Sequence, residues 1–443
     1  MAEQTPAETF DERYELRWVT PKAPVDGVAD EEASAFVAAM DLGFHVPRQA
    51  PEAVAFTVSG WATGGTELLG AYRRHPQPGS MDAAAPIGTF GALPKRLSWG
   101  DGTGIDTYAI VGVTVRATER RRGVLRAMMT DALHRAAETG YAVASLTASE
   151  GTIYRRFGFG PAIRERTITV TRDRALPLLV APAGEVVVVE PGWLADGVGR
   201  AVFDRFHART LGSMVRNVSA WPRIFGQRAA DGKPDAGLRA AVHRPAADAE
   251  PDGYVTYRFV DTDNHGSRVQ VEDLVYADEQ AYLALWEFLL SIDLVSAVRY
   301  PFARIPDPIT HVLADNRAFD IDHEEDHVWL RVLDPVAVLT SRPYAADGGV
   351  VLEIADTMGL AAGVVELSVR DGRGSASRLA SIDDADSSSV LSLDVATLGS
   401  LLLGAVDAAE LHDVGLITGD RDAAELLAAM LRPARTPHGI TYF

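Results

Sequence analysis

Residues 113 to 129 read Val-Thr-Val-Arg-Ala-Thr-Glu-Arg-Arg-Arg-Gly-Val-Leu-Arg-Ala-Met-Met, and this stretch decides the fold. It begins inside the apolar, β-branched run 108–115, which predicts a strand buried on both faces of a sheet. Beyond Gly123 the apolar residues recur at the spacing of a helix. A strand, an arginine-rich turn and a helix in this order predict an α/β unit.

The turn itself predicts a site for an anion. Arg120, Arg121 and Arg122 stand immediately before Gly123, and the helix is expected from Val124. The free amides at the start of a helix attract anions, glycine lets a phosphate approach the backbone, and guanidinium groups add charged donors. We therefore expect a cradle for a diphosphate; the plainer alternative is a solvated basic start of a helix.

Segments on both sides of this stretch extend the α/β unit. Residues 142–147 predict a second buried strand, parallel to the first and joined to it by a right-handed crossover. A short helix is expected from Gly151 to Phe157, where Gly158 ends it. Upstream, the pattern predicts one helix and two strands, over 31–40, 53–58 and 67–72.

The chain has 443 residues and is expected to contain several domains, because single cores stop growing at about 250–300 residues. Strands over 253–260 and 268–276 with a helix over 279–290 resemble the first unit without its arginines, which indicates a degenerate second copy. Three strands and two helices then predict a separate α+β domain, over 326–334, 349–356, 363–369, 395–403 and 423–431. The expected domains are residues 1–164, 165–320 and 321–443.

Composition and charge limit the partners. The formal net charge of −19 opposes binding to nucleic acid and favours a cationic small molecule. Cysteine is absent, which excludes disulfides, thiolate metal sites and a cysteine nucleophile. No apolar stretch is long enough for a membrane span, and the first residues lack a basic region followed by an apolar run, so we expect a cytoplasmic protein.

The turn Arg120-x-x-Gly123 after a buried strand resembles the acetyl-CoA signature of the GCN5-related N-acetyltransferases (GNAT), although Leu125 replaces the usual small residue. The stretch 113–129, the segment 149–160 and the terminal Phe443 resemble the enhanced intracellular survival (Eis) acetyltransferases. This resemblance implies an α/β (α+β) fold of two tandem GNAT-like domains followed by a domain similar to sterol carrier proteins. It also implies a homo-oligomer, which is a hexamer in relatives.

The resemblance assigns acetyl-CoA as the co-substrate and roles to its binding residues. The strand backbone at Val113 and Val115 would pair with the pantetheine arm, and Ser149 would contact the cofactor. The diphosphate would be bound by the turn and the first helical residue, namely Arg120, Arg121, Arg122, Gly123 and Val124.

The resemblance also assigns two catalytic groups. Tyr154 would be the general acid that protonates the departing thiolate, and the terminal carboxylate of Phe443 would be the general base. The alternative for Tyr154 is an aromatic side chain that packs against Phe157. Two departures leave the substrate range open: Tyr442 stands where some relatives have an acidic residue, and Thr147 stands where others have histidine.

The expected reaction moves an acetyl group from acetyl-CoA to primary amines of polycationic small molecules, aminoglycosides by resemblance, or to lysine side chains, at one or several positions. The alternative is a non-catalytic protein that binds lipid or acetyl-CoA through its sterol-carrier-like domain. A scaffold assembled as an oligomer is a third possibility, and it does not compete with catalysis.

Two metal motifs in the sequence do not fit their surroundings. His323-Glu-Glu-Asp-His327 matches the zinc pattern His-Glu-x-x-His, but the segment is too polar for a buried metal helix and a strand is expected from Val328. Residues 261–266 with Glu272 nearly fit a calcium loop, yet strands flank them where that loop needs helices, so a hairpin turn is favoured. We therefore expect no metal site.

Overall fold

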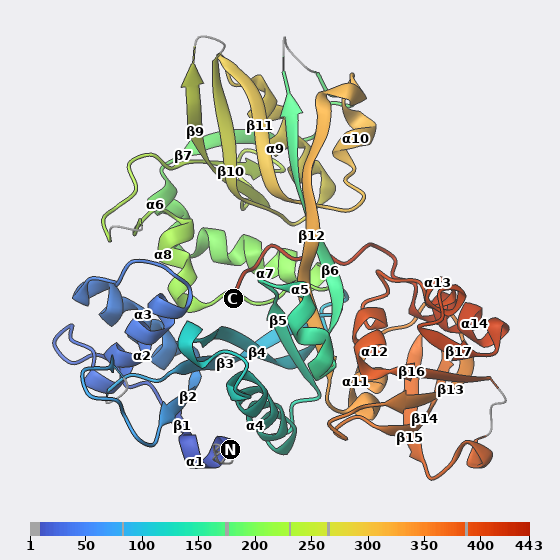
Figure 1. Ribbon diagram of the computed structural model, residues 1–443. Helices are drawn as coiled ribbons and strands as arrows, with labels where there is room; N and C mark the ends of the chain where they lie inside the picture. The colour runs from blue at the N-terminus through green and yellow to red at the C-terminus, as the bar shows by residue number, and fades with distance from the viewer. Residues whose placement is uncertain (1–8, 82–83, 173–176, 230–231, 264–265, 386–388) are drawn as a thin grey trace.

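The computed structural model describes residues 9–81, 84–172, 177–229, 232–263, 266–385 and 389–443. Its strands form one 12-stranded sheet and one five-stranded sheet. In Figure 1 the large sheet passes through two bodies, one above the other, and the small sheet forms a third body beside the lower one.

The first body, blue to teal in Figure 1, is built on strands β1 to β5. The first four strands pair antiparallel in sequence order, and β4 then pairs parallel with β5, as expected for strands joined by a helical crossover. The strands are β1 (Tyr14–Val19), β2 (Glu67–Arg73), β3 (Gly88–Ser98), β4 (Gly104–Val115) and β5 (Val143–Thr147). The helices are α1 (Phe10–Arg13), α2 (Glu31–Gly43), α3 (Pro51–Gly64), α4 (Val124–Glu138) and α5 (Gly151–Tyr154).

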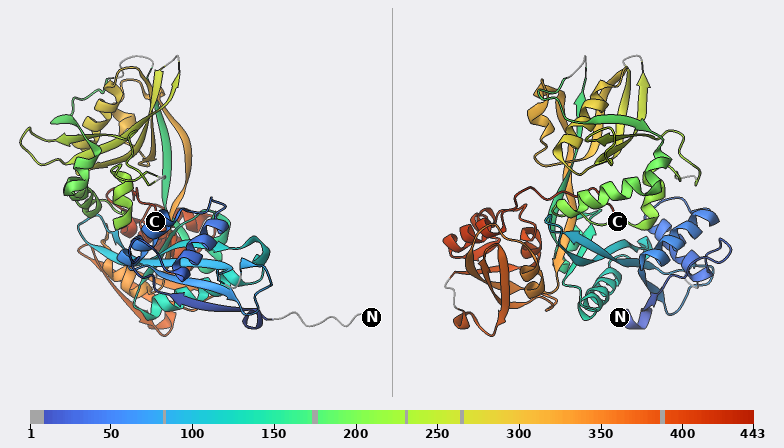
Figure 2. Two further views of the ribbon diagram at one scale, coloured as in Figure 1. Left: turned by 90° about the vertical axis from the view of Figure 1, so that its left-hand side faces the viewer. Right: turned by 180° about the vertical axis from the view of Figure 1, so that it is seen from behind.

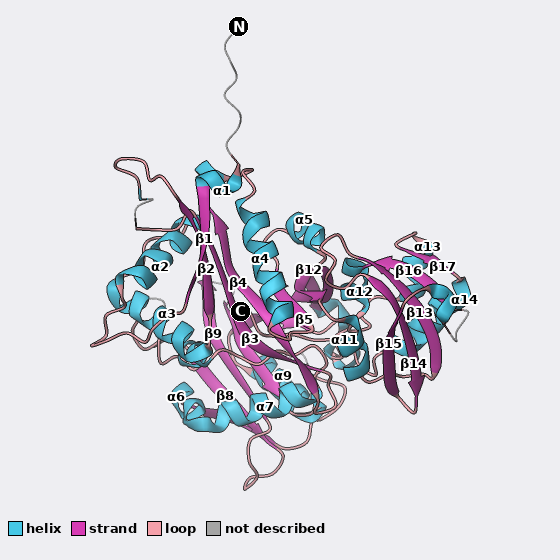
Figure 3. Ribbon diagram, turned by 90° about the horizontal axis from the view of Figure 1, so that it is seen from below, coloured by secondary structure: helices cyan, strands magenta, loops and turns pink. Residues whose placement is uncertain are grey.

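Helices cover both faces of these strands. Because successive residues of a strand point to opposite faces, the neighbours Leu68 and Leu69 of β2 show which helix lies on which side. Leu68 packs with Phe36 of α2, whereas Leu69 packs in the cluster that contains Met128 of α4. The strands of the first body are therefore sandwiched between α4 on one face and α2 on the other (Figure 3).

The second body repeats this arrangement with β7 to β11. Four strands pair antiparallel in sequence order, and β10 then pairs parallel with β11 across helix α9. The strands are β7 (Glu185–Val189), β8 (Arg239–Arg244), β9 (Gly253–Asp263), β10 (Gly266–Tyr276) and β11 (Val295–Ala303). The helices are α6 (Pro191–Trp193), α7 (Gly199–Arg209), α8 (Trp221–Ile224), α9 (Glu279–Ser291) and α10 (Ile309–Val312). The second copy predicted from the sequence is present.

Two long strands join both bodies into one sheet. β6 (Gly160–Thr171) and β12 (Phe319–Val332) pair antiparallel with each other, while β12 also pairs with β5 and β6 with β11. The order of the large sheet is therefore β1-β2-β3-β4-β5-β12-β6-β11-β10-β9-β8-β7. Both views of Figure 2 show these two strands, green and orange, running from the lower body into the upper one.

The third body is an α+β domain on the five-stranded sheet, whose order is β15-β14-β13-β16-β17. Its strands are β13 (Gly348–Ala355), β14 (Gly363–Arg370), β15 (Arg373–Leu379), β16 (Val390–Asp394) and β17 (Ile417–Gly419). Its helices are α11 (Pro335–Ser341), α12 (Val395–Leu401), α13 (Ala408–Asp413) and α14 (Arg421–Leu431). The α+β domain predicted for the last region is confirmed.

After α14 the chain returns to the large sheet. The backbone N–H of His438 donates to the carbonyl of Leu211 at 2.8 Å, and the hydroxyl of Thr441 donates to the carbonyl of Met214 at 3.0 Å. Burial lowers the pKa of His438 to about 3, so its ring is neutral at physiological pH. With these hydrogen bonds, the chain ends between the first and second bodies, near the centre of Figure 1.

Residues 53–58, expected as a strand, lie within α3, so this prediction is wrong. Pro51 stands at the start of the helix and Gly65, with φ of +67°, ends it in the left-handed region. Ala55 and Val58, three positions apart, are the buried residues of the helix. The strand and helix periods cannot be separated over so short an apolar run.

The first strand expected for the last domain begins earlier than expected, because β12 starts at Phe319. Two of its acidic residues are matched by arginines of β6 and β11: Glu324 lies 2.7 Å from Arg166, and Asp322 lies 3.4 Å from Arg299. β12 belongs to the large sheet. The division of the chain at residues 164 and 320 stays a prediction.

β9 and β10 form the hairpin favoured over a calcium loop, since they pair antiparallel. Residues 264–265 of its turn lie outside the described residues. Of the helices that the structure describes, none has both the length and the apolar character needed to cross a bilayer.

Gly160→Ala should destabilise the protein. A Cβ at this position would lie 1.9 Å from the carbonyl oxygen of Ala396, so α12 would have to move away from β6. We expect the free energy of unfolding to fall by about 1–3 kcal/mol, measured by urea or thermal unfolding. Gly192→Ala is the matched control, because a Cβ there meets no atom within 4 Å. Equal effects of both substitutions would contradict the tight contact.

Candidate active site

The arginine-rich turn leads into α4 as expected. Gly123 precedes the helix with φ of +83°, a conformation that favours glycine, and within the described part of the chain no side chain caps the first amides of α4. Arg120, Arg121 and Arg122 are exposed, and Arg121 also has a positive φ of +61°. The turn therefore offers uncapped backbone N–H groups beside exposed guanidinium groups, which suits an anion.

A buried carboxylate that the sequence analysis missed supports this turn. Glu119, 2% exposed, accepts hydrogen bonds from the Tyr14 hydroxyl and from Arg73, both at 2.5 Å, and lies 3.7 Å from Arg122 Nη1. Burial raises the pKa of Glu119, but the hydrogen bonds from Tyr14 and Arg73 and the nearby charges outweigh it and hold the pKa below its usual value. One of the three arginines is thus already paired within the protein.

β4 loses a partner strand before its end. Its parallel pairing with β5 ends where Ile110 lies opposite Leu146, although β4 continues to Val115. Among the strands that the structure describes, β4 pairs with β3 and β5 alone, so its edge on the β5 side has no strand partner from residue 111 onward. Val113 and Val115 belong to this unpaired part. Such an edge offers N–H and C=O groups to an extended ligand.

A β-bulge turns β4 at the same point. The register between β3 and β4 shifts around Gly112, which has φ of +61°. The hydroxyl of Thr89 donates to the carbonyl of Gly112 at 2.8 Å and lies 2.7 Å from the hydroxyl of Thr114. A bulge bends its strand and increases the local twist. The bulge therefore accompanies the separation of β4 from β5.

Two of the expected site residues follow the end of β5, the strand that separates from β4. Ser149 is exposed in the loop after β5, and Tyr154 ends α5 with 6% of its surface exposed. The ring of Tyr154 contacts Phe159 edge-on, with centroids 6.2 Å apart. Burial raises the pKa of Tyr154, and the charge of Glu150 adds to the shift. Its hydroxyl therefore stays protonated at neutral pH.

A cavity of about 460 Å³ contains the last residue of the chain. Phe443 lines it together with Gly112 at the bulge of β4. Helices α2 and α3 and the segment around α8 supply further walls, with Met40, Phe44, Phe56, Trp61, Asn217, Ser219 and Arg223 among the lining residues. The cavity therefore borders the point at which the open edge of β4 begins.

This cavity is lined mainly by apolar groups. Among the described residues that line it, Arg223 is the only basic one, and none carries a carboxylate side chain. The guanidinium of Arg223 lies 5.7 Å from the centroid of the Phe56 ring. Phe443 therefore lines a cavity whose described lining carries no acidic side chain.

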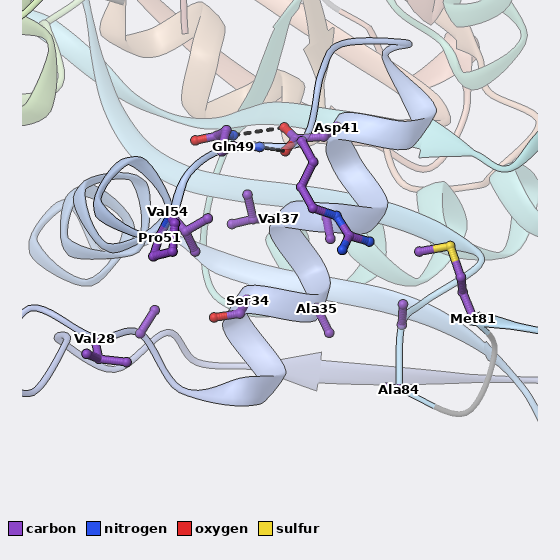
Figure 4. A pocket seen from close by; sticks show the side chains of 14 residues that line it. Val28, Ser34, Ala35, Val37, Asp41, Gln49, Pro51, Val54, Met81 and Ala84 are labelled. Carbon is purple, nitrogen blue, oxygen red and sulfur yellow. Dashed lines mark hydrogen bonds between the residues drawn. The ribbon is translucent and has the colours of Figure 1, made fainter. Parts of the chain in front are cut away.

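A second cavity of about 450 Å³ lies beside α2. Figure 4 shows Val37 and Asp41 of α2, which line this cavity, and Met81 to the right of the helix. Asp41 is buried and accepts hydrogen bonds from the backbone N–H and the side-chain amide of Gln49, at 3.1 and 2.8 Å. Its described lining includes no residue of β4 and not the terminal residue. The cavity with Phe443 is therefore the better candidate for an acceptor.

The chain enters the cavity past a second carboxylate that the sequence analysis missed. The hydroxyl of Tyr442 donates to Glu165 of β6, 2.6 and 2.7 Å from its two oxygens. His327 Nδ1 also lies 2.8 Å from Glu165, and its ring centroid lies 4.8 Å from that of Tyr442. Glu165 and Tyr442 are 277 residues apart, so no local sequence signal marks their contact.

The two histidines of the zinc-like motif do not face a common site. Both lie on β12, where the His323 side chain is 58% exposed near Glu325 and the His327 side chain is fully buried beside Glu165. Within the described ranges, no group of three or more His, Cys, Asp or Glu side chains is placed to hold a metal ion.

Glu119→Gln should weaken the turn and alter the pH dependence of stability. Because the folded-state pKa of Glu119 is lowered, its carboxylate stabilises the fold above the usual pKa of 4.5, and this contribution is lost as the pH falls through the folded-state pKa. We expect the free energy of unfolding at neutral pH to fall by about 1–3 kcal/mol. The difference should shrink in acid, and thermal unfolding across pH measures it.

The control for this variant is Glu138→Gln, which removes an exposed carboxylate at the end of α4. It should leave the unfolding curve nearly unchanged at every pH. A difference between the native protein and Glu119→Gln that does not vary with pH would contradict the stabilising role of the ionised Glu119.

Family models match the three bodies in turn. The acetyltransferase (GNAT) domain matches residues 25–162 and, through a second model, residues 212–332. A sterol carrier protein domain matches residues 335–439. The expected α/β (α+β) fold of two GNAT domains followed by a sterol-carrier-like domain is confirmed.

Individual relatives agree with the family models. An uncharacterised N-acetyltransferase of Streptomyces avermitilis is 33% identical over 369 residues, which cover 81% of this chain and 86% of that protein. N-acetyltransferase Eis of Mycobacterium tuberculosis is 34% identical over 312 residues, 68% of this chain and 71% of that protein. The crystal structure of Eis1 from Mycobacterium abscessus superposes with a TM-score of 0.77 at 28% identity, covering 97% of this chain and 100% of that one. The chain therefore belongs to the Eis family of GNAT N-acetyltransferases and is an acyltransferase.

Proposed function

We propose that the protein transfers the acetyl group of acetyl-CoA to a primary amine bound in the cavity that Phe443 lines. The observation that supports this proposal most directly is that the cavity borders Gly112, next to the open edge of β4. A thioester extended along that edge would present its carbonyl carbon to the cavity. Donor and acceptor would then meet at the bulge, which removes most of the entropic cost of bringing them together.

The residues expected from the family resemblance form a suitable donor site. The backbone at Val113 and Val115 would pair with the pantetheine arm as an added strand does. Arg120 and Arg121 would reach the diphosphate, and the uncapped amides from Gly123 onward would bind its oxygens. By the family resemblance, Arg122, Val124 and Ser149 would complete this site.

Acetyl transfer requires an amine without its extra proton. A primary alkylamine has a pKa near 10.4, so a base has to accept a proton at neutral pH, and we assign this role to the terminal carboxylate of Phe443. The nitrogen then bonds to the carbonyl carbon, which a backbone N–H near Val113 polarises. As the bond from carbon to sulfur breaks, the thiolate takes a proton from Tyr154, whose raised pKa keeps its hydroxyl protonated until that step.

The lining of the cavity indicates which amines fit. The rings of Phe44, Phe56 and Trp61 can contact an apolar stem and attract a cationic group over their faces. Arg223 opposes additional positive charge. An amine at the end of an apolar stem, as in a lysine side chain, therefore fits this lining better than a polycation, and aminoglycoside-like amines are the second class that we propose.

We further propose a homo-oligomer, a hexamer by family resemblance, that does not bind nucleic acid, because the formal net charge of −19 opposes it. A protein that only binds lipid or acetyl-CoA is the less favoured alternative, since the relatives named above are acetyltransferases.

Tyr154→Phe should lower kcat and leave KM for acetyl-CoA nearly unchanged. The ring can still pack against Phe159, but it has no proton to donate. Removal of a general acid costs about 10²–10⁴-fold in rate. Thiol release from acetyl-CoA at a saturating amine concentration measures the effect. Tyr141→Phe, a change at a half-buried tyrosine of the same body, is the control, and normal turnover of Tyr154→Phe would remove Tyr154 from the mechanism.

One glycine added after Phe443 should abolish most of the activity, because it replaces the terminal carboxylate by a neutral peptide group. We expect kcat/KM to fall about 10²-fold or more. Binding of coenzyme A, measured by calorimetry, should not change. Phe443→Leu is the control, since it keeps the carboxylate on an apolar side chain. Native activity of the extended chain would show that another group is the base.

The same assay compares the acceptor classes. We expect a higher kcat/KM for a lysine derivative with a blocked α-amine than for kanamycin, because the lining carries few charges. The reverse order would show that the cavity is adapted to polycations.

A further inference from the structure

We propose that the buried pair of Arg331 and Asp356 positions Tyr154 for proton transfer, and that the sterol-carrier-like domain acts on the reaction through this pair. Arg331 lies on β12 and Asp356 follows β13 in the third body. Both are positioning residues that act through the backbone of the segment that carries Tyr154. The inference rests on the proposed role of Tyr154 as general acid.

Arg331 connects this segment to the third body. Its side chain is fully buried, Nε donates to the carbonyl of Phe157 at 2.8 Å, and Nη2 lies 2.7 Å from Asp356 Oδ2. Nη1 donates to the carbonyl of Val332. Phe157 ends the short 3-10 segment that follows Tyr154 directly. One planar side chain therefore ties the end of the Tyr154 segment to a carboxylate of another domain.

Asp356 is itself fixed in place. Its side chain is 1% exposed and accepts hydrogen bonds from the backbone N–H groups of Met358 at 3.0 Å and Ala361 at 2.8 Å, in addition to Arg331. Burial raises the pKa of Asp356, but the Ala361 N–H and the Arg331 charge outweigh burial and hold the pKa below its usual value. The carboxylate therefore stays ionised at neutral pH and keeps its pairing with Arg331.

The same loop of the third body also packs on the Tyr154 side. Met358 and Leu360 contact the apolar cluster that includes Tyr154, Phe157 and Phe159. The third body thus reaches the segment both through an ion pair and through apolar contacts.

Two glycines show how closely the segment is enclosed. Gly158 has φ of +84°, and a Cβ on it would lie 2.5 Å from Arg331 Nε and 2.8 Å from a methyl carbon of Val395 in α12. A Cβ on Gly160 would lie 1.9 Å from the carbonyl oxygen of Ala396. The chain after Tyr154 is therefore held between Arg331 and α12, with no room to shift toward either.

Tyr154 depends on this support because its own hydroxyl is not anchored. Among the described residues, none makes a hydrogen bond to the hydroxyl of Tyr154. Its position follows from ring packing against Phe159 and from the course of the backbone. A small displacement of a reacting group can cost about 10²-fold in rate. Loosening the Phe157 carbonyl would therefore move the proton donor without touching it.

The main test is the double variant Arg331→Met with Asp356→Asn. It removes both charges together, and the Asn oxygen can still accept from one of the two backbone N–H groups, which bond to different oxygens of Asp356. We expect kcat to fall about tenfold or more with KM for acetyl-CoA unchanged, since a displaced proton donor affects turnover and not cofactor binding. Amide hydrogen exchange over residues 151–160 should become faster.

The chain offers a matched control pair. Arg155 also ties the same segment to the third body, 3.1 Å from Asp394, but both partners of this pair are exposed. Asp394 accepts from the N–H of Thr397 at the start of α12, a role that Asn can take over. Arg155→Gln with Asp394→Asn should therefore leave kcat and hydrogen exchange near the native values.

Combining each double variant with Tyr154→Phe separates positioning from general damage. If Arg331 and Asp356 act through the Tyr154 hydroxyl, replacing them should lower kcat only slightly further in a protein that already carries Tyr154→Phe. An equal, additive loss in both backgrounds would overturn the inference. So would native kcat in the Arg331→Met, Asp356→Asn variant while Tyr154→Phe is impaired.

Normal turnover of Tyr154→Phe would instead show that Tyr154 is not the general acid, and this inference would then be refuted as well. Should the double variant not fold, Arg331→Lys keeps the charge but lacks the planar group that reaches both Asp356 and Phe157. Full kcat with unchanged hydrogen exchange in Arg331→Lys would also overturn the inference.

Discussion

The separation of β4 from β5 beyond Ile110 is the constraint on which the rest of the site depends. If the two strands stayed paired to Val115, no strand edge would be free for an extended thioester. β5 tolerates the loss because β12 pairs with residues 143–147 on its other side. β4 is turned by the bulge at Gly112, which the Thr89 hydroxyl stabilises through a hydrogen bond. The opening therefore depends on hydrogen bonds of both strands: β5 pairs with β12, and the Gly112 carbonyl of β4 accepts from Thr89.

The second GNAT domain contributes to the site without a cradle of its own. Ala277-Asp-Glu-Gln280 follows β10 where the first domain has its arginines, so this turn of the second copy lacks their positive charge. It supplies instead the segment around α8 that closes the cavity of Phe443. It also supplies β11, which pairs with β6, the strand that carries Glu165. A copy without the arginine-rich turn thus serves as a wall of the cavity beside the first copy.

Local signals in the sequence predicted the elements from residue 108 to residue 157, because an apolar run, a glycine and a helical repeat each act over a few residues. The helix α3 was mistaken for a strand because a short apolar run does not separate the two periods. Gly112 could have been noticed, since a glycine inside an apolar strand often marks a bulge. The pairs Glu165–Tyr442 and Arg331–Asp356 could not be predicted, because no local pattern in the sequence marks residues that are so far apart along the chain. The assigned cofactor and catalytic residues stay predictions.

The sterol-carrier-like domain is better described as part of the enzyme's frame than as a separate carrier. A single apolar cluster runs from Val350 and Leu352 of its sheet to Val328 and Leu330 of β12 and on to Leu97 of β3. Moving this domain as a unit would expose that cluster to water, at about 25 cal/mol for each Å² of apolar surface. The domain is consequently fixed relative to β12, and two features of the site depend on that: the chain that ends at Phe443 and the carboxylate opposite Arg331. A domain that is packed against the large sheet, leads the chain back to the cavity at Phe443 and contacts the Tyr154 segment is thus structurally part of the acetyltransferase.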